Sequence, residues 1–202
     1  MNNAGAAEPR YTRRVNDLVL DAARSRVQIH TFAEGVLARL AHDLALLCVE
    51  LSGAASRGPD AASATTGTAS IEVPLRGLQV AGVLTKDGRI DESGLSPRER
   101  RDVLAKMQKD VFHGGPDAVV RVEAHLEGGS VRLHILPPNG KAVELLERPD
   151  LRNEDDGLRA TGHFEVSLAA IGSDVVKGPL GAFRVKDRIR ILYDVLFLPA
   201  PK

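Results

Sequence analysis

The feature that most constrains this chain is the alternation of apolar and polar residues along most of its length. Period-two alternation places every second side chain on the same face of a strand, so it predicts strands with one buried and one solvated face. Such strands are typical of antiparallel sheets, because parallel strands are usually apolar on both faces. The alternating segments are residues 18–20, 27–31, 69–73, 120–126, 131–135, 143–145, 158–168 and 185–197.

One hairpin can be checked within the sequence itself. Gly128-Gly129 is suited to a two-residue turn, because both glycines tolerate a positive φ. A turn at this point brings three apolar pairs to one face, namely Leu126–Val131, Ala124–Leu133 and Val122–Ile135. The polar pairs on the other face are His125–Arg132 and Glu123–His134. Because a slip of one residue would break every apolar pair, we expect this register.

One amphipathic helix interrupts the strands. Ser96-Pro97-Arg98-Glu99 predicts a capping box with proline at the first helical position. Apolar residues follow at helical spacing until Gly114-Gly115-Pro116 ends the element. A single helix beside many strands has to lie across the sheet. We therefore predict a mainly β fold, an extended antiparallel β-barrel of about eight strands with this helix capping one end.

The sequence also predicts the domain organisation and the segments between the clear strands. The polar residues 1–17 predict a mobile N-terminal arm, and residues 18–198 predict a single barrel domain. The stretch 53–67 is rich in Ala, Ser, Thr and Gly and is interpreted as a loop. Residues 36–51 fit both a helix and a strand, and we expect a short helix over 35–41 followed by a strand from about Asp43.

Composition excludes several classes of protein. The 27 basic and 27 acidic side chains cancel, so no net field draws the chain to nucleic acid or to anionic lipid. The longest apolar run, Leu44 to Val49, is too short to span a bilayer. The lone Cys48 excludes a disulfide framework. The first residues contain no apolar core of a signal peptide, so the expected compartment is the cytoplasm.

The sequence contains no recognisable catalytic motif, neither a nucleophile elbow nor a phosphate-binding loop nor a zinc-protease motif. We therefore expect a protein that is not an enzyme, with no catalytic residue, no metal and no cofactor. His42-Asp43 is the one arrangement that stays open, because a carboxylate can orient a histidine as a general base or a metal ligand. Adjacent strand residues point to opposite faces, which weakens this pair.

The order of these features resembles the YceI-like family, small proteins built as an extended, lipocalin-like antiparallel β-barrel. The segments that carry the resemblance run from Leu20-Asp21 to Val27, from Arg100 to Leu104, from Phe112 to Val120, and from Gly162 to Ile191 with Ile171-Gly172 and Phe183 to Ile189 inside it. Together they cover nearly the whole of Leu18 to Phe197. The resemblance implies binding of an isoprenoid or another apolar chain inside the barrel without turnover. Many members of this family carry a secretion signal, so the resemblance also implies that many of them are located outside the cytoplasm.

Inward-facing apolar residues are the candidate ligand contacts. A barrel of about eight strands can hold one slender ligand, and each buried CH₂ contributes roughly 0.8 kcal/mol to binding. The candidate lining residues are Phe32, Leu47, Val49, Val122, Leu133, Phe164, Val166, Phe183, Ile191 and Tyr193.

Three hypotheses about function follow. The first is a non-enzymatic barrel that binds an apolar small molecule or lipid. The second is a hydrolase-like or metal-assisted enzyme that uses His42 and Asp43 at the barrel mouth. The third is an interaction module whose barrel is solid, which a large exposed apolar patch would favour. The expected partner is an apolar molecule rather than nucleic acid, and a homodimer stays open.

Overall fold

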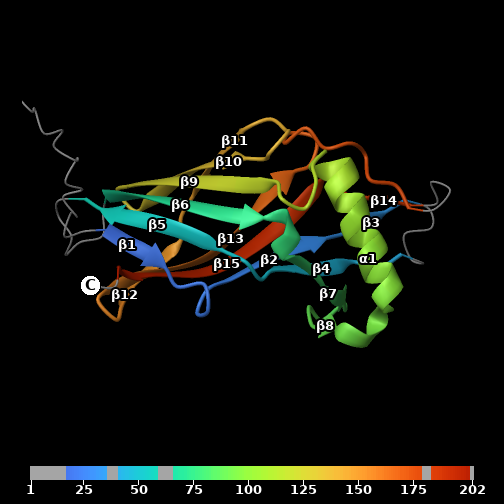
Figure 1. Cartoon of the computed structure of the whole chain (residues 1–202), viewed down its shortest axis with the longest axis horizontal. Helices are drawn as coiled ribbons and strands as arrows, with labels where there is room; N and C mark the ends of the chain where they lie inside the picture. Colours follow the sequence, from blue (N-terminus) through green and yellow to red (C-terminus); the bar gives the residue numbers. More distant parts are fainter. Residues whose placement is uncertain (1–16, 36–40, 59–65, 179–182, 201–202) are drawn as a thin grey trace, which may run out of the picture.

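A curled antiparallel sheet forms a half-barrel and makes up most of the molecule (Figure 1). The computed structural model describes residues 17–35, 41–58, 66–178 and 183–200. The strands are β1 Asp17–Leu20, β2 Arg26–Thr31, β3 Ala33–Glu34, β4 Leu44–Cys48, β5 Ser52–Arg57, β6 Thr66–Pro74, β7 Leu78–Leu84, β8 Ile90–Asp91, β9 Val119–Glu127, β10 Ser130–Leu136, β11 Val143–Glu147, β12 Asp150–Glu154, β13 Gly157–Ser167, β14 Arg184–Val185 and β15 Arg188–Pro199.

The long strand β15 organises the sheet. One of its edges pairs with β13 along nearly its whole length. Its other edge pairs first with β2 and then with β1, so two groups of strands diverge from it. From β1 the sheet continues through β5, β6, β9 and β10 to β11, and from β2 it continues through β4 and β7 to β8. Among the described residues, thirteen strands therefore share this sheet, more than the about eight expected.

The predicted hairpin is confirmed. Leu126 pairs with Val131, and the register continues as expected through β9 and β10. Gly128 and Gly129 have φ values of 57° and 81°, the conformation that the two-residue turn requires. Alternation on a half-buried strand was therefore a sufficient guide to register here, because every alternative would have buried the charged face.

The described part of the stretch 53–67, which was interpreted as a loop, is mostly strand, and for these residues the interpretation was wrong. Residues 52–57 form β5, which pairs with β1 on one edge and β6 on the other. Ser, Gly and Ala have low β-propensity, so the strand gave no signal of its own. It forms because it has a hydrogen-bonding partner on each side. Residues 59–65 of this stretch lie outside the described residues.

The last alternating segment, 185–197, is two strands rather than one. Asp187 interrupts it, because its carboxylate accepts a hydrogen bond from the Ala169 backbone N–H (2.8 Å) and so secures the connection between β13 and β15. This hydrogen bond also lowers the pKa of Asp187. The residues before the break form β14, which pairs with β3 in a separate two-stranded sheet, where Val185 lies opposite Ala33.

The helix begins as the sequence predicts. Helix α1, Pro97–Lys106, is capped by reciprocal hydrogen bonds between Ser96 and Glu99. It continues into a π-helical turn, η4, Met107–Val111. Two short 3-10 helices, η2 Leu75–Gly77 and η3 Glu92–Gly94, lie at strand ends. The expected strand near Asp43 is β4, whereas most of the short helix expected over 35–41, like the N-terminal arm through residue 16, lies outside the described residues.

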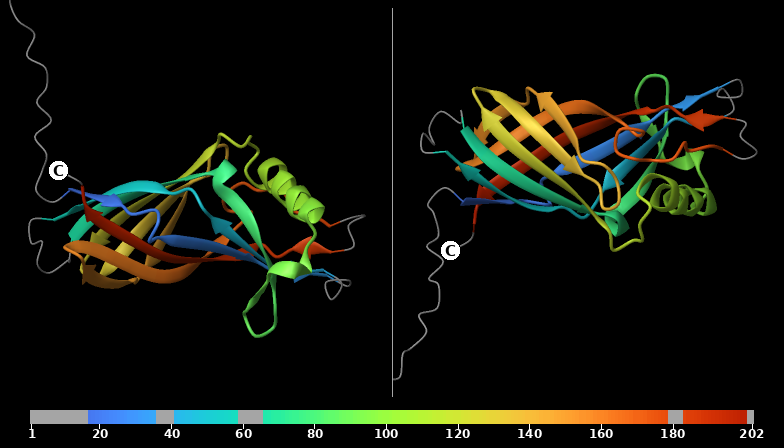
Figure 2. Two further views of the ribbon diagram at one scale, coloured as in Figure 1. Left: turned by 60° about the horizontal axis from the view of Figure 1, so that its bottom comes forward. Right: turned by 90° about the horizontal axis from the view of Figure 1, so that it is seen from above.

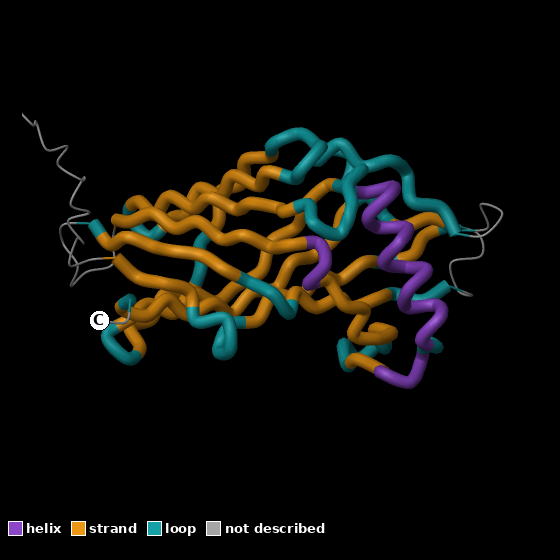
Figure 3. The backbone as a smooth tube through the Cα atoms, in the orientation of Figure 1, coloured by secondary structure: helices purple, strands orange, loops and turns teal. Residues whose placement is uncertain are grey.

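Arg100 fastens α1 to the sheet. Its guanidinium donates hydrogen bonds to the carbonyls of Val80, Ala81 (3.0 Å), Glu92 and Leu95 (3.4 Å). Four backbone acceptors are thereby satisfied by one side chain. The helix lies across one end of the sheet in all views (Figures 1 to 3). We call this the helix end.

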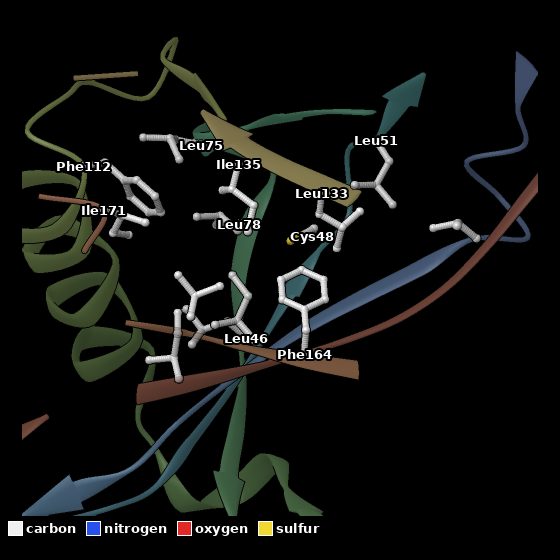
Figure 4. Close-up of a cluster of buried hydrophobic side chains, with 14 of the residues drawn as sticks. Leu46, Cys48, Leu51, Leu75, Leu78, Phe112, Leu133, Ile135, Phe164 and Ile171 are labelled. Atoms are coloured by element: carbon white, nitrogen blue, oxygen red, sulfur yellow. The ribbon is translucent and has the colours of Figure 1, made fainter. Parts of the chain in front are cut away.

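The opposite end of the sheet is where β9 turns into β10 and β12 turns into β13, and we call it the hairpin end (Figure 2). The tightly packed part of the core lies toward the helix end. There Leu46 and Leu75 are 0% and 1% exposed, and they gather with Leu78, Phe112 and Ile171 (Figure 4). Among the described residues there is no helix long and apolar enough to cross a membrane.

Candidate ligand-binding cavity

The curled sheet encloses a cavity of about 160 Å³ between its middle and the hairpin end. Its walls are almost entirely apolar. The lining residues come from β1, β2, β5, β6, β9, β10, β12, β13 and β15 and from the β11–β12 connection: Leu18, Val27, Ala55, Ser56, Arg57, Thr66, Gly67, Thr68, Ala69, Ile71, Val73, Val122, Ala124, Leu126, Val131, Leu133, Pro149, Leu151, Leu158, Ala160, Phe164, Ile191, Tyr193, Val195 and Phe197. We call this space the lumen.

Small inward-facing side chains leave the lumen open. Ala55 lies opposite Ala69, which lies opposite Ala124, so three alanines stand side by side across β5, β6 and β9. Ala160 on β13 adds a fourth to the wall. At the helix end the corresponding inward positions are occupied by leucines such as Leu75 and Leu78. Because alanine reaches only one carbon from the backbone, the same curvature of sheet encloses empty space at one end and a filled core at the other.

Two aromatic rings close the inner part of the lumen. The centroids of the Phe164 and Tyr193 rings are 5.9 Å apart, with the rings tilted by 46°. Tyr193 lies opposite Gly162, and its ring covers the space that a side chain would take, since a Cβ on Gly162 would come within 2.5 Å of the tyrosine Oη. Burial, reinforced by the charge of Glu147, raises the pKa of Tyr193 to about 12. The phenol therefore stays neutral in the physiological range.

At the hairpin end, Arg57 extends from β5 across the lumen to the turn between β12 and β13. Its Nη2 donates hydrogen bonds to the carbonyl oxygens of Gly157 and Asp156, the latter at 3.2 Å. This turn is a tight one in which Asp155 and Asp156 both have positive φ, 50° and 61°. Positive φ is disfavoured for residues with a Cβ, so the turn depends on its hydrogen-bonding partners.

Charged side chains secure the same turn from outside. Arg24 pairs with Glu154 (2.6 Å) and with Asp155 (2.7 Å). Arg159 pairs with Glu154 (3.0 Å) and with Asp194 on the neighbouring strand (2.6 Å). These carboxylates stabilise the charged form of Arg159 and raise its pKa. A network of charges on the outer surface thus holds one side of the mouth of the lumen.

Half of the ten candidate residues line the lumen and half lie elsewhere. Those in the wall are Val122, Leu133, Phe164, Ile191 and Tyr193. Those outside the wall are Phe32, Leu47, Val49, Val166 and Phe183. Contact of any of the ten with a ligand stays a prediction.

The five residues outside the wall have different surroundings. Val49 follows β4 and is 49% exposed. Val166 is buried in the core cluster. Phe32 lies beneath the ammonium group of Lys186, 5.9 Å from the ring centroid, and Phe183 packs beside Gly178. Leu47 is half-buried between Leu46 and Cys48, whose side chains point to the other face.

The wall residues that sequence reasoning missed are the small ones. Large side chains, above all the scarce aromatics, were expected to line the space, whereas the space exists where inward-facing residues are small. The alternating segments around Ala69, Ala124 and Ala160 contained this signal. It would have been visible if the size of each inward-facing residue had been compared from one end of the strand to the other.

His42 and Asp43 do not form a site with the lumen. His42 is exposed, and neither residue lines a described cavity. The Asp43 carboxylate accepts a hydrogen bond from the Ala33 backbone N–H at 2.8 Å, which is a structural contact. Among the described residues, no group of three or more His, Cys, Asp or Glu side chains is placed to hold a metal ion. Burial raises the pKa of the Cys48 thiol to about 12, so this cysteine is unreactive.

Comparisons with known proteins bear on the fold. No protein-family model matches the sequence, and no curated protein matches it. The solved structures that match include the crystal structure of Burkholderia cenocepacia BcnA, with a TM-score of 0.58 and 13% sequence identity, covering 88% of this chain and 98% of that chain. At this identity the likeness shows the fold alone. It supports a lipocalin-type fold for this chain, and membership of the YceI-like family stays a prediction.

Proposed function

We propose that this protein binds an apolar ligand, an isoprenoid or another lipid chain, in the lumen and does not transform it chemically. The observation that carries the proposal is the lumen itself, an apolar space of about 160 Å³ inside a curled sheet. An apolar cavity of similar size engineered into another protein, about 150 Å³, stays dry and takes up benzene. The lumen thus has room for a ring or for one segment of a slender chain.

The driving force is removal of apolar surface from water. Each CH₂ that moves from water into the lumen contributes about 0.8 kcal/mol, which is about fourfold in the dissociation constant. Affinity should therefore rise with chain length until the lumen is full. Such binding needs no specific polar motif, which fits a sequence in which no such motif is present.

The chemistry of the wall supports binding rather than catalysis. None of the described lining residues is His, Cys, Asp, Glu or Lys. Among the described lining residues, the ionisable side chains are those of Arg57 and Tyr193, and the pKa of Tyr193 is raised to about 12. A general base near neutral pH needs a group that can exchange a proton there. The Tyr193 phenol, with its raised pKa, does not fit that requirement.

The two other hypotheses have less support. His42 is exposed and outside the described cavities, so no described arrangement favours a hydrolase-like or metal-assisted reaction there. An interaction module would present a contiguous apolar patch. The exposed large apolar residues among those described, Val19, Val49, Leu146 and Val175, lie on separate elements. A homodimer and a cytoplasmic location stay predictions.

Two experiments test the proposal. Native mass spectrometry of freshly purified protein should show a fraction with extra mass that organic solvent removes. Isothermal titration with the n-alkanols from hexanol to dodecanol should show affinity that rises about fourfold per CH₂ and then levels off. A ligand-free spectrum together with no measurable heat for any alkanol would contradict the proposal.

A matched pair of variants localises the binding. Ala55 faces the lumen, whereas its neighbour Ala54 is exposed on the outer face of the same strand. Ala55→Leu should abolish alkanol binding by filling the lumen, and Ala54→Leu should leave binding unchanged. Equal effects of the two substitutions would place the bound alkanol outside the lumen.

A further inference from the structure

The described wall of the lumen ends at a clear boundary on four strands. On each of them the next inward-facing residue toward the helix end belongs to the filled core and is 9% exposed or less. The last wall residue and the first core residue are Val27 and Ile29 on β2, Leu133 and Ile135 on β10, Phe164 and Val166 on β13, and Ile191 and Ile189 on β15. We call Val27, Leu133, Phe164 and Ile191 the floor of the lumen.

Phe164 is the largest side chain of this floor and belongs to both regions. It lines the lumen, and it is also 8% exposed and a member of the buried core cluster. Its ring points from β13 toward Leu133 on β10, across the interior (Figure 4). On the side of the hairpin end it contacts the Tyr193 ring, with 5.9 Å between the centroids. Removal of the Phe164 ring would therefore extend the lumen toward the helix end.

The core beyond the floor leaves no room for a ligand. Val166 and Ile189 are 4% and 8% exposed and pair directly across β13 and β15. Protein interiors are packed as densely as organic crystals, and forcing an extra methylene into such a core typically costs more than the burial of that methylene contributes. A chain that enters from the hairpin end is therefore stopped at the floor, and any further carbons stay outside the mouth.

The polarity of the wall changes along the lumen. The serine and threonine residues of the wall, Ser56, Thr66 and Thr68, lie near the ends of β5 and β6 at the hairpin end. The four floor residues, in contrast, have hydrocarbon side chains only. A hydroxyl group placed against them would lose its hydrogen bonds to water and gain none from these side chains. An amphiphile therefore gains most when its apolar end enters first.

We infer that Phe164 determines the length of chain that the lumen accepts. The ligand enters from the hairpin end with its apolar end first, its terminal carbon lies against the Phe164 ring, and its polar group stays toward the mouth. This inference rests on the proposed function, since it assigns the orientation and the buried length of the ligand in the same lumen. The class of ligand is then a chain with one apolar end, and a chain that is polar at both ends is excluded.

The test measures the chain length at which affinity stops rising, which we call the plateau. The n-alkanols from hexanol to dodecanol are titrated by calorimetry into the wild-type protein and into Phe164→Ala. Removal of the ring should move the plateau by at least about two CH₂ groups, so that dodecan-1-ol binds Phe164→Ala at least about tenfold more tightly than it binds the wild type. Octane-1,8-diol, which has to bring a hydroxyl to the floor, should bind the wild type at least about tenfold more weakly than octan-1-ol.

Two further variants separate the floor from the rest of the wall. Phe197→Ala is the matched control, because Phe197 also lines the lumen and is 4% exposed but pairs with Leu158 near the hairpin end. It should weaken all the alkanols by a similar factor and leave the plateau at the wild-type chain length. Phe164→Leu keeps most of the buried volume and decides the question if Phe164→Ala does not fold. It should bind dodecan-1-ol roughly fourfold more tightly than the wild type does, the gain of one CH₂.

The outcomes distinguish the inference from the proposed function. If the alkanols bind but the Phe164 variants keep the wild-type plateau, or if Phe197→Ala moves it equally, Phe164 does not set the length and the proposed function stands. If octane-1,8-diol binds as tightly as octan-1-ol, the apolar end does not lie at the floor and the inference is again wrong. If no alkanol binds to the wild-type protein, the proposed function fails and the inference fails with it.

Discussion

The two ends of this sheet are built from the same kind of alternating strand and yet are packed differently. At the helix end, Leu46, Leu75 and Leu78 fill the space under the sheet. At the hairpin end, Ala55, Ala69 and Ala124 occupy inward positions and leave the lumen. The curvature of a sheet thus encloses a volume, and the size of inward-facing residues determines whether the volume is core or binding space.

The largest expected effect tests the packing at the two ends directly. Leu46→Ala should lower the free energy of unfolding by about 3 kcal/mol, because Leu46 is 0% exposed and its removal leaves a cavity in a filled core. Leu126→Ala, in the wall of the lumen, should lower it by only about 1 kcal/mol, since that side chain already faces empty space. Urea unfolding followed by circular dichroism measures both, and equal losses would contradict the difference between the ends.

Enlarging an alanine should lower the free energy of unfolding at the helix end and leave it nearly unchanged in the lumen. Ala45 is 0% exposed, so Ala45→Leu should overpack its surroundings and lower the free energy of unfolding by about 2 kcal/mol. Ala69→Leu should change it by less than about 0.5 kcal/mol, because the added carbons enter the lumen. The same unfolding measurement applies, and a large loss for Ala69→Leu would show that the lumen is already filled.

The hydrogen bonds that attach α1 to the helix end of the sheet should contribute to the free energy of unfolding. Arg100→Met removes hydrogen bonds to backbone carbonyls of β7 and η3 and should lower the free energy of unfolding by about 1.5 kcal/mol. Arg98→Met is the control and should have no measurable effect, since Arg98 is exposed and lies 3.9 Å from Asp102. An unchanged stability for Arg100→Met would mean that apolar packing alone holds the helix.

The positive φ of Asp156 in the turn at the hairpin end predicts that one substitution will stabilise the protein. Asp156 has a φ of 61°, which glycine adopts without steric penalty, so Asp156→Gly should raise the free energy of unfolding by about 0.5 kcal/mol. Thermal unfolding monitored by calorimetry measures the change. A loss of stability would indicate that the Asp156 side chain contributes more than its backbone strain costs.

The smallest expected effect is a pH dependence at His30. Burial, with the positive charge of Arg190 second, lowers the pKa of His30 in the folded state. The unfolded chain then binds the proton more readily, so this residue contributes stability that is fully present above about pH 6.5 and decreases as the pH falls. His30→Gln should reduce the slope of stability between pH 5 and 7. An unchanged slope in urea unfolding across that range would contradict this assignment.

Sequence patterns predicted correctly the elements whose interacting residues lie close together in the chain. The register of β9 and β10 follows from apolar alternation around Gly128-Gly129, and the start of α1 follows from the reciprocal hydrogen bonds of Ser96 and Glu99. Both depend on residues a few positions apart in the chain, and local chemistry is sufficient for such elements.

Sequence-based prediction failed for the elements whose interaction partners lie far away in the chain. Strand β5 has the composition of a loop and forms because β1 and β6 pair with its edges. Arg57 could not be placed at the mouth, because its acceptors at Asp156 and Gly157 lie about a hundred residues away. The lumen likewise depends on Ala55, Ala69 and Ala124 meeting across three strands.

The most direct measurement is a crystal structure of the protein with 1-bromooctane, in which anomalous scattering locates the bromine. Binding in the lumen predicts a bromine peak and density for the alkyl chain between Ala69 and Ala160, with the rings of Phe164 and Tyr193 at the inner end. Crystals of the Ala55→Leu variant should lack that peak. Bromine found only on the outer surface, or side chains of the wild-type protein filling the space, would contradict the existence of an apolar binding site in this sheet.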